Sequence, residues 1–425
     1  MELKKYKLAD IANIEISGVD KKTIEGETPV RLCNFVDVYY NWAVTKEKAK
    51  VFMKASAKQT EMDKCSIGKG MVAITKDSET RDDIGIATYI ADDFEDVLLG
   101  YHCALITPNP AVVDGKYLNA FMHTRYIQKY FENNASGSGQ RYTLSNDTIS
   151  NIPVLLPSIK VQHIIGKLLA DLDRKIELNK QINDNLEAMA KQLYDYWFVQ
   201  FDFPNEEGKP YKSSGGAMVW NEKLKREIPQ GWTAAKIKDV AQTYSGGTPT
   251  STNSEYYDGG DIPWINSGEL NNPIITSTTN YITEEGLNNS SAKLYPQDTV
   301  LVALYGATAG KVSLLSFEAC SNQAVCSVIP QNKIMTTYIR YYLSSLYEHF
   351  ITLSSGSARN NISQDTIKNT ILPIPQGKIL KEFSDAVAPI ISKIIANQKE
   401  MENLTKQRDE LLPLLMNGQA VVNSD

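Results

Sequence analysis

The sequence predicts an α+β protein in which a mixed α/β domain occurs twice and each copy leads into one long helix. The first observation is a run of about 38 residues from Lys160 in which apolar residues recur every three to four positions, so a helix of roughly 57 Å is expected. The second observation is an internal repeat. Residues 147–149 (DTI) return as residues 365–367, an offset of 365 − 147 = 218 that continues without a gap for about 55 residues.

The first copy of the domain is expected over residues 1–157, followed by its long helix and an aromatic end over residues 158–204. In order, the sequence predicts a short strand and helical turn at 5–14, strands at 68–76 and 104–108, an amphipathic helix at 118–134, and a polar loop at 135–149.

The second copy is expected over residues 231–375, with its long helix and tail over residues 376–425. Its strands are predicted at 298–306 and 324–330, its helix at 338–350 and its polar loop at 356–367. The middles of the two copies differ far more than their edges. Residues 205–230 are rich in Gly, Pro, Ser and charges, which predicts a linker with one short helical piece.

The apolar stripe of the first long helix is interrupted by Lys175 and Asn179, and the repeat places Asn397 at the position of Asn179. A polar residue in such a stripe can fix the register of a helix pair. A solvent-facing Asn is the alternative, but we favour the register role because both copies are interrupted at the same place. The residues expected to line the helix pair or contact a partner are Leu172, Asn179, Ile182, Leu186, Met189, Leu193, Tyr196, Trp197, Phe198, Ile390, Ile394, Asn397, Leu404, Leu411 and Leu415.

An aromatic cluster ends the first long helix and has two interpretations that the sequence supports equally. The side chains could fill the core of a domain, or they could form a docking face for a partner, because aromatic residues are favoured interface anchors. The cluster consists of Tyr194, Tyr196, Trp197, Phe198, Phe201 and Phe203.

Composition narrows the class of protein. The 425 residues can form two or three domains, no apolar run is long enough to span a membrane, and the opening MELKKYKLAD has no signal-peptide pattern, so a cytoplasmic protein is expected. The five cysteines are scattered, which predicts buried small hydrophobes and neither disulfides nor a zinc site. A net charge of −6 disfavours a protein that binds nucleic acid unaided, although it allows a local basic face or a more basic partner.

Motifs for catalysis are missing. Residues 306–313 (GATAGKVS) resemble a phosphate-binding loop, but the spacing between Gly306 and Gly310 is too short and Val312 occupies the Ser/Thr position. A tight turn between strands, or a close approach of the backbone to DNA, fits the glycines better. No methyltransferase, helicase, metal or acid–base pattern is present, and the sequence therefore predicts a chain that is not itself an enzyme.

Polar and aromatic residues on loops remain as the candidates for function. Arg pairs with guanine O6 and N7, and Asn or Gln with adenine N6 and N7, so these loops favour DNA binding. An ordinary turn role is the alternative for each single residue and fits it equally well. The candidates are Gln140, Arg141, Tyr142, Tyr244, Ser245, Gly246, Gly247, Thr248, Asn266, Ser267, Tyr305, Thr308, Lys311, Arg359, Asn360 and Asn361.

Four sequence motifs resemble those of the specificity subunit of type I restriction-modification enzymes. They are LYDYWFVQFDFP (193–204), RDELLPLLMNGQ (408–419), GGTPTST (246–252) and IPWINSG (262–268). The chain departs from the family pattern in having no Gly-Trp pair, such as Gly231-Trp232, before its first domain, which leaves the edge of that domain less defined.

The resemblance implies two target-recognition domains in a pseudo-twofold repeat, separated by two long helices that form an antiparallel coiled coil. Each domain would read one half of a split, asymmetric sequence in double-stranded DNA. The implied partners in a bacterial or archaeal cell are a pair of modification subunits that bind S-adenosylmethionine and methylate adenine, and restriction subunits that hydrolyse ATP with Mg²⁺. This chain itself would hold no cofactor.

The alternative from another class is a duplicated coiled-coil scaffold that binds protein or peptide partners and not DNA. Two divergent middles on matched frames argue against this alternative, since a bipartite reader needs two different surfaces on one scaffold.

Overall fold

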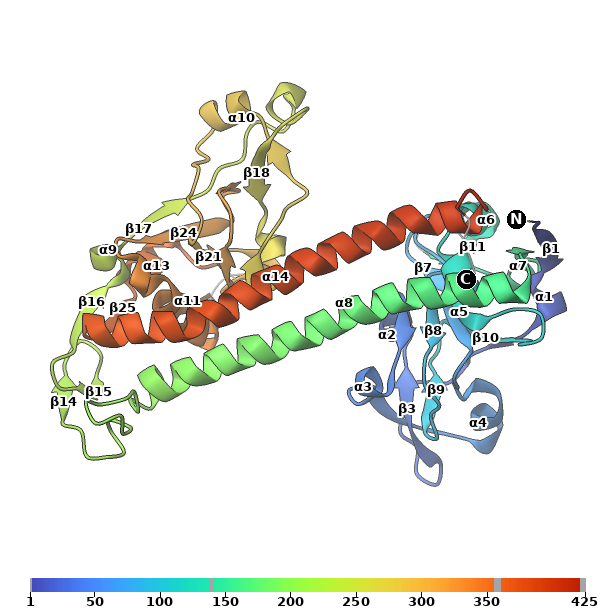
Figure 1. The fold of residues 1–425 in the computed structure, drawn as a ribbon, viewed down its shortest axis with the longest axis horizontal. Coiled ribbons are helices and arrows are strands. Elements are labelled where there is room, and N and C mark those ends of the chain that lie inside the picture. The colour runs from blue at the N-terminus through green and yellow to red at the C-terminus, as the bar shows by residue number, and fades with distance from the viewer. Residues whose placement is uncertain (1, 138–140, 355–360, 421–425) are drawn as a thin grey trace. The chain divides into compact units, whose positions relative to one another are not determined.

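The computed structural model describes residues 2–137, 141–354 and 361–420 (Figure 1). The chain divides into two compact units, each with one mixed domain and one portion of both long helices. Unit 1 comprises Met1–Leu178 and Met401–Asp425, and unit 2 comprises Asn179–Glu400.

Unit 1 holds the first mixed domain. Its strands are β1 (Lys4–Lys7), β2 (Ala12–Ile16), β3 (Thr28–Cys33), β4 (Ala43–Val44), β5 (Met53–Ala57), β6 (Val72–Thr75), β7 (Asp77–Ser78), β8 (Ala87–Ile90), β9 (Val97–Leu99), β10 (Cys103–Pro108), β11 (Ser136–Gly137), β12 (Tyr142–Thr143) and β13 (Pro153–Leu156). Its short helices are α1 (Leu8–Ile11), α2 (Phe35–Tyr39), α3 (Lys46–Ala49), α4 (Gln59–Cys65), α5 (Gly115–Met122), α6 (Arg125–Asn134) and α7 (Asn146–Ser150).

The main sheet of unit 1 has the strand order β2-β10-β6-β8-β4, and its central strands are buried on both faces. Side chains of a strand alternate between the two faces of its sheet. Ile74 and Ile106 therefore enter the core that contains α5, whereas Ala73 and Leu105 enter a second core on the other face. The predicted strands at 68–76 and 104–108 are thus present as β6 and β10.

Unit 2 holds the second mixed domain. Its strands are β14 (Met218–Asn221), β15 (Arg226–Pro229), β16 (Thr233–Lys236), β17 (Ala241–Ser245), β18 (Ile262–Ile265), β19 (Ile274–Ile275), β20 (Tyr281–Ile282), β21 (Val300–Ala303), β22 (Val312–Leu315), β23 (Cys320–Ser321), β24 (Val325–Pro330) and β25 (Ile371–Ile374). Its helices are α9 (Ile237–Val240), α10 (Glu284–Asn288), α11 (Thr336–Ser345), α12 (Tyr347–Ser354) and α13 (Gln364–Asn369). Its 3₁₀ turns are η2 (Ser254–Tyr256), η3 (Ser267–Asn271), η4 (Gly306–Thr308) and η5 (Lys333–Met335).

The two domains share one strand topology. The main sheet of unit 2, β17-β24-β21-β22-β19, matches that of unit 1 strand for strand, including the parallel pairing of the last two strands. The smaller sheets β5-β3-β9 and β20-β18-β23 also match, each with one antiparallel and one parallel pair. The predicted duplication is confirmed. It includes the middle part of each domain, where the two sequences have diverged.

The long helices are α8 (Ile159–Tyr194) and α14 (Gly377–Met416). In unit 2, the Asn179 side chain donates to Glu400 (3.0 Å), and the Asn397 side chain donates to Asn183 (2.8 Å). Asn179 thus contacts residue 400 of α14, and Asn183, four residues later in α8, contacts residue 397, which is earlier in α14. The two helices therefore run antiparallel, as expected. In unit 1, Leu411 and Leu172 lie against the same core.

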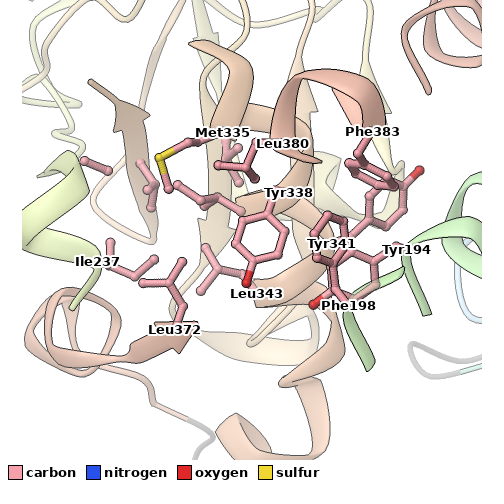
Figure 2. Packing of buried hydrophobic residues seen from close by; sticks show 14 of the residues in the cluster. Tyr194, Phe198, Ile237, Met335, Tyr338, Tyr341, Leu343, Leu372, Leu380 and Phe383 are labelled. Carbon is pink, nitrogen blue, oxygen red and sulfur yellow. The ribbon is translucent and has the colours of Figure 1, made fainter. Parts of the chain in front are cut away.

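The aromatic end of α8 continues into one turn of π-helix, Asp195–Val199, and enters the core of unit 2. Figure 2 shows Tyr194 and Phe198 packed with Tyr338 and Phe383. Five of the six clustered aromatics are buried, and only Tyr196 is largely exposed, at 38%. The structure therefore assigns the core role to most of this cluster and leaves one side chain facing outward.

Three local predictions are wrong. The helix expected over 338–350 is two helices, α11 and α12, because α11 ends at Ser345 and α12 begins at Tyr347. The helix expected over 118–134 is two helices, α5 and α6, because the Thr124 side chain caps a new helix by accepting from the Ile127 amide. The helical piece expected in the linker is instead the hairpin of β14 and β15. The Asn221 side chain organises its turn by accepting from the amides of Lys223 (3.0 Å) and Leu224 (3.1 Å).

Other expectations agree with the fold. The five cysteines are buried and free of disulfides. Residues 306–308 form a turn between β21 and β22, with Gly306 at φ 77° and Gly310 at φ 81°, a left-handed conformation that favours glycine. Among the described residues, no helix has the length and apolar character needed to cross a membrane.

Candidate nucleic-acid interface

Three segments meet at one edge of the main sheet in unit 1. The Lys76 amide, after β6, donates to the His102 carbonyl, before β10 (2.8 Å), and the Leu144 amide donates to the Lys76 carbonyl (2.8 Å). This backbone frame brings Asp77 and Arg141, which are far apart in the sequence, next to His102.

The same frame is present in unit 2. The Leu304 amide donates to the Ala324 carbonyl (2.7 Å), and the Ile362 amide donates to the Leu304 carbonyl (2.9 Å). Tyr305 and Asn361 form the adjoining antiparallel bridge. The two domains therefore present different side chains from one backbone arrangement.

In unit 1, the frame carries a cluster of three polar side chains, which we call the Asp77 cluster: Asp77, His102 and Arg141. Asp77 accepts a hydrogen bond from Nδ1 of His102. Arg141 Nη2 lies 2.9 Å from both ring nitrogens of His102 and 4.0 Å from the Asp77 carboxylate. His102 has φ 72°, a left-handed conformation that is uncommon for a residue other than glycine, and this conformation is held by the strand pairing on its C-terminal side.

Asp77 is charged at neutral pH. Its burial acts to raise the pKa, but hydrogen bonds from Thr143 and His102 and the charge of Lys76 outweigh burial and hold the pKa of Asp77 below its ordinary value. Lys76 Nζ lies 3.4 Å from Asp77 and donates to Thr143 (3.2 Å). The carboxylate is thereby fixed as an acceptor beneath Arg141.

The Asp77 cluster lines a hollow of about 580 Å³ on the surface of unit 1. Tyr40, which is 78% exposed, lies at its rim beside Tyr39, with the two rings edge to face. Tyr142 lies on the neighbouring strand β12 under the guanidinium of Arg81, 5.1 Å from the ring centre. The residues lining the hollow are Phe35, Val36, Tyr39, Tyr40, Asp77, Ser78, Glu79, Thr80, Asp83, His102 and Arg141.

The corresponding edge of unit 2 is formed by hydroxyl and amide side chains. Thr248 is exposed and hydrogen-bonded to Gln323, which precedes Ala324 of the frame. Tyr305 is 39% exposed, and Asn361 is exposed beside it. Ser245 donates to the Gln364 side chain (3.1 Å) at the start of α13. These predicted residues therefore gather around one edge.

Other predicted contact residues have structural roles. Gly246, Gly247 and Thr308 are buried. A Cβ atom on Gly246 would lie 2.2 Å from the Asn322 carbonyl oxygen, and one on Gly247 would lie 2.3 Å from a backbone nitrogen. Both glycines thus permit close backbone packing, and the Trp264 indole donates to the Gly247 carbonyl (2.9 Å), so direct base contact from these glycines is not favoured.

Asn266 caps the turn η3. Its amide donates to Glu269 (2.9 Å), and its side chain accepts from Asn322 (3.0 Å). Asn34 at the matching position of unit 1 has the same arrangement with Asp37 (2.8 Å). Asn266 is therefore a capping residue, and the half-buried Ser267 follows it as the first residue of the turn.

The remaining predicted residues are dispersed or undescribed. Lys311 contacts the Asn271 side chain, and the ring of Tyr244 lies 4.5 Å below Lys293. Gln140, Arg359 and Asn360 lie outside the described residues.

Sequence reasoning missed Asp77, His102 and Gln323. No local motif marks these residues. His102 and Gln323 lie just before β10 and β24, two strands that occupy the same place in the repeat, so aligning the two copies could have found them.

One of the two sets of heptad positions predicted for the first long helix is one residue out of register. Ile182, Met189 and Tyr196 are 42%, 57% and 38% exposed, so they are not seam residues. Asn183 and Ala190, one position later, lie in the seam instead. The buried or partly buried predicted residues are Leu172, Leu186, Leu193, Trp197, Phe198, Ile390, Ile394, Asn397, Leu404, Leu411 and Leu415, and Asn179 is half-buried at the edge of the pair.

Within residues 2–137, 141–354 and 361–420, no group of three or more His, Cys, Asp or Glu side chains is placed to hold a metal ion. The described polar clusters consist of hydrogen-bonding groups suited to recognition.

Comparison with known proteins identifies the family. The model of the type I restriction modification DNA specificity domain matches twice, at residues 2–188 and 229–406. The HindI specificity subunit of Haemophilus influenzae is 28% identical over 396 residues, covering 80% of this chain and 85% of the relative. The MjaIX specificity subunit of Methanocaldococcus jannaschii is 28% identical over 319 residues, covering 74% of this chain and 71% of the relative.

A solved structure has the same fold. The S subunit of a type I restriction-modification system from M. genitalium superposes with a TM-score of 0.59 at 14% identity, covering 98% of this chain and 96% of that one. Two family matches, one over each mixed domain, agree with the two equivalent frames. The chain belongs to the family of type I restriction-modification DNA specificity subunits, in which it is the component for DNA sequence recognition and not a catalytic subunit.

Proposed function

We propose that this chain reads a bipartite, asymmetric site in double-stranded DNA, with one half of the site bound by each domain. The observation that carries the proposal is the repeated backbone frame with unlike side chains. A common frame gives both domains the same way of approaching DNA, and different side chains give them different base preferences.

The chemistry of the two edges fits two different half-sites. The Asp77 cluster offers a guanidinium beside a carboxylate and an imidazole, whereas the second domain offers Thr248, Tyr305, Gln323 and Asn361. Arg favours guanine, and Asn or Gln favours adenine. Two unlike halves make an asymmetric site.

The catalytic subunits are proposed to be separate chains. A pair of modification subunits would bind S-adenosylmethionine and methylate adenine, restriction subunits would use ATP and Mg²⁺, and this chain would hold no cofactor. Its net charge of −6 supports shared DNA binding, because phosphate contacts need cations that a more basic partner can supply. The complex would act in the cytoplasm of a bacterial or archaeal cell.

The outer face of α8 is the surface that we propose for a modification subunit. Ile182, Met189 and Tyr196 recur at intervals of seven residues and are exposed in unit 2. Apolar and aromatic side chains spaced in this way lie along one face of a helix and are typical anchors of an interface.

The test is a methylation map. The chain and its modification subunit are expressed together in a host without other adenine methylation, and methylated adenines are located across the genome. We expect one motif of two defined halves with a fixed spacer. Replacing residues 233–370 by those of another family member should change one half only. An uninterrupted motif, or a change in both halves, would contradict the proposal.

A further inference from the structure

We infer that Arg141 reads a guanine in the half-site of the first domain, and that Asp77 and His102 are positioning residues that hold Arg141 for this contact. The inference rests on the proposed function. It adds which base is read, which residue reads it and which two residues hold that residue in place.

The Asp77 cluster is largely buried at Asp77 and His102 and exposed at Arg141. The side chains of Asp77 and His102 are 12% and 25% exposed, whereas that of Arg141 is 62% exposed. Asp77 is held by Thr143 and Lys76, His102 by Asp77, and Arg141 by His102. A flexible arginine loses side-chain entropy when it binds, so holding it in advance favours a directional contact.

The donors that remain on Arg141 suit guanine. Within the described part of the chain, only Nη2 of Arg141 has a hydrogen-bond partner, and Nε and Nη1 contact no acceptor. Nη2 carries two N–H groups, so the one that does not face His102 can still form a parallel pair with an N–H of Nε or Nη1, and guanine O6 and N7 accept such a pair in the major groove.

The charge of the hollow favours a base edge over a phosphate. Three carboxylates, Asp77, Glu79 and Asp83, line the same hollow as Arg141, and Asp83 also accepts from the Tyr39 hydroxyl (2.7 Å). A phosphate that entered the hollow would be repelled by these carboxylates. A base edge carries no net charge, and carboxylates can accept hydrogen bonds from the amino groups of bases.

The second domain lacks the supporting pair. Tyr305 and Ala324 occupy the frame positions of Asp77 and His102, so neither a carboxylate nor an imidazole is present there. Arg359 matches Arg141 by the repeat offset but lies outside the described residues. The inference is therefore confined to the first half-site, which is the half that survives exchange of residues 233–370.

The experiment compares methylation maps of the wild-type complex and the Arg141→Gln complex. The wild-type first half-site should contain a guanine. In the variant, the preference for guanine at one position should fall by about 10- to 100-fold, while the second half stays unchanged. Asp77→Asn, which removes the charge that fixes His102, should relax the same position to a smaller extent. Arg125→Gln is the matched control, because Arg125 is an equally exposed arginine (68%) outside the hollow.

Several outcomes would overturn the inference. A first half-site without guanine would do so, as would an Arg141→Gln motif identical to the wild type. A uniform loss of methylation at all sites, with a weaker salt dependence of DNA binding, would instead identify a phosphate contact. In each of these cases the bipartite motif of the wild type still supports the proposed function, whereas a wild type without such a motif would refute the proposed function itself. Equal thermal unfolding midpoints for all variants would show that folding is intact.

Discussion

The two halves of the molecule repeat one topology but fill the space between their long helices in opposite ways. In unit 1, Asp173 faces Arg408 at 3.9 Å, and the Arg408 guanidinium stacks on Trp42, 4.8 Å from the ring centre. The repeat offset of 218 places Ile391 and Ala190 at the matching positions of unit 2, and both pack in apolar clusters. A charged pair and an apolar pair at these aligned positions thus support the same helix pairing, so the identity of these residues is not what defines the fold.

The domains are also joined to α8 by different ion pairs. In unit 1, Lys48 of α3 contacts Glu177 at 3.1 Å in a partly exposed position. In unit 2, Arg340 of α11 is 1% exposed and contacts Glu187 at 2.7 Å. Unit 2 thus combines one deeply buried charge with a seam of apolar side chains and the buried amides of Asn183 and Asn397, whereas unit 1 has several charges along the seam. Single substitutions in each unit test whether this difference determines the free energy of unfolding of that unit.

The largest effect is expected from the aromatic end of α8. Trp197 is 7% exposed and packs against Phe383 with 5.8 Å between ring centres. Trp197→Ala removes a large buried ring, so the free energy of unfolding of unit 2 should fall by about 3 to 5 kcal/mol. Native-state hydrogen exchange at the amides of α11 measures this change, and protection of unit 1 strands such as β6 should be retained.

The neighbouring Tyr196 is the matched control, because it precedes Trp197 and its side chain is 38% exposed. Tyr196→Ala should change the free energy of unfolding by less than about 0.5 kcal/mol and should weaken binding of the modification subunit, measured by calorimetry. Comparable destabilisation by the two variants would refute the division of this cluster into core and outer residues.

The fold was predictable wherever a pattern recurs in the sequence. Apolar runs indicate β6 and β10, helical periodicity indicates α8 and α14, and the repeat connects the two halves. The break between α5 and α6 was not predictable, because apolar spacing continues across it and the interruption depends on the Thr124 hydroxyl. The hairpin at Met218–Pro229 likewise depends on hydrogen bonds that the Asn221 side chain accepts, and no periodic pattern in the sequence indicates these bonds.

An intermediate effect, with a dependence on pH, is expected at Asp173 in the polar seam. Burial raises the pKa of Asp173 to about 6, because the nearby charges of Lys48 and Arg408 only partly compensate for the loss of water. The folded state therefore binds the proton more tightly than the unfolded state, and stability is lost as pH rises through about 4 to about 6. Asp173→Asn should raise the free energy of unfolding of unit 1 above pH 6 by about 1 to 3 kcal/mol.

The measurement is hydrogen exchange in urea at several pH values, for wild type and variant, at the amides of unit 1 strands such as β6. The stability gain of Asp173→Asn should disappear below about pH 4, where the wild-type carboxyl group is protonated in both states. Asp171→Asn is the control, since Asp171 is exposed on the same helix and pairs with Lys167. A gain that is independent of pH would show that Asp173 does not titrate as described.

The candidate site was less predictable than the fold. Tyr305, Asn361 and Thr248 were found because they lie on polar loops, but the same criterion also selected Gly246 and Gly247, which are buried. Composition cannot separate the two groups, because exposure is decided by which loops pack on which strands. The Asp77 cluster was only partly found, since Asp77 and His102 are brought together by the pairing of β6 with β10 and carry no motif of their own.

The smallest effect is expected from the two asparagines that the repeat aligns, and it tests whether a buried amide sets helix register. Asn397 is 1% exposed and donates to Asn183, whereas the half-buried Asn179 donates to the side chain of Glu400. Asn397→Leu leaves the Asn183 oxygen without its donor, so the free energy of unfolding of unit 2 should fall by about 1 kcal/mol, and Asn179→Leu should have almost no effect.

Spin labels at the exposed positions Lys180 and Lys399 report register directly. The distance distribution should broaden in Asn397→Leu and stay narrow in Asn179→Leu, because only a buried polar pair penalises a shifted alignment of the helices. A narrow distribution in the Asn397→Leu, Asn179→Leu double variant would assign the register to the apolar contacts of Leu186 and Ile394 instead.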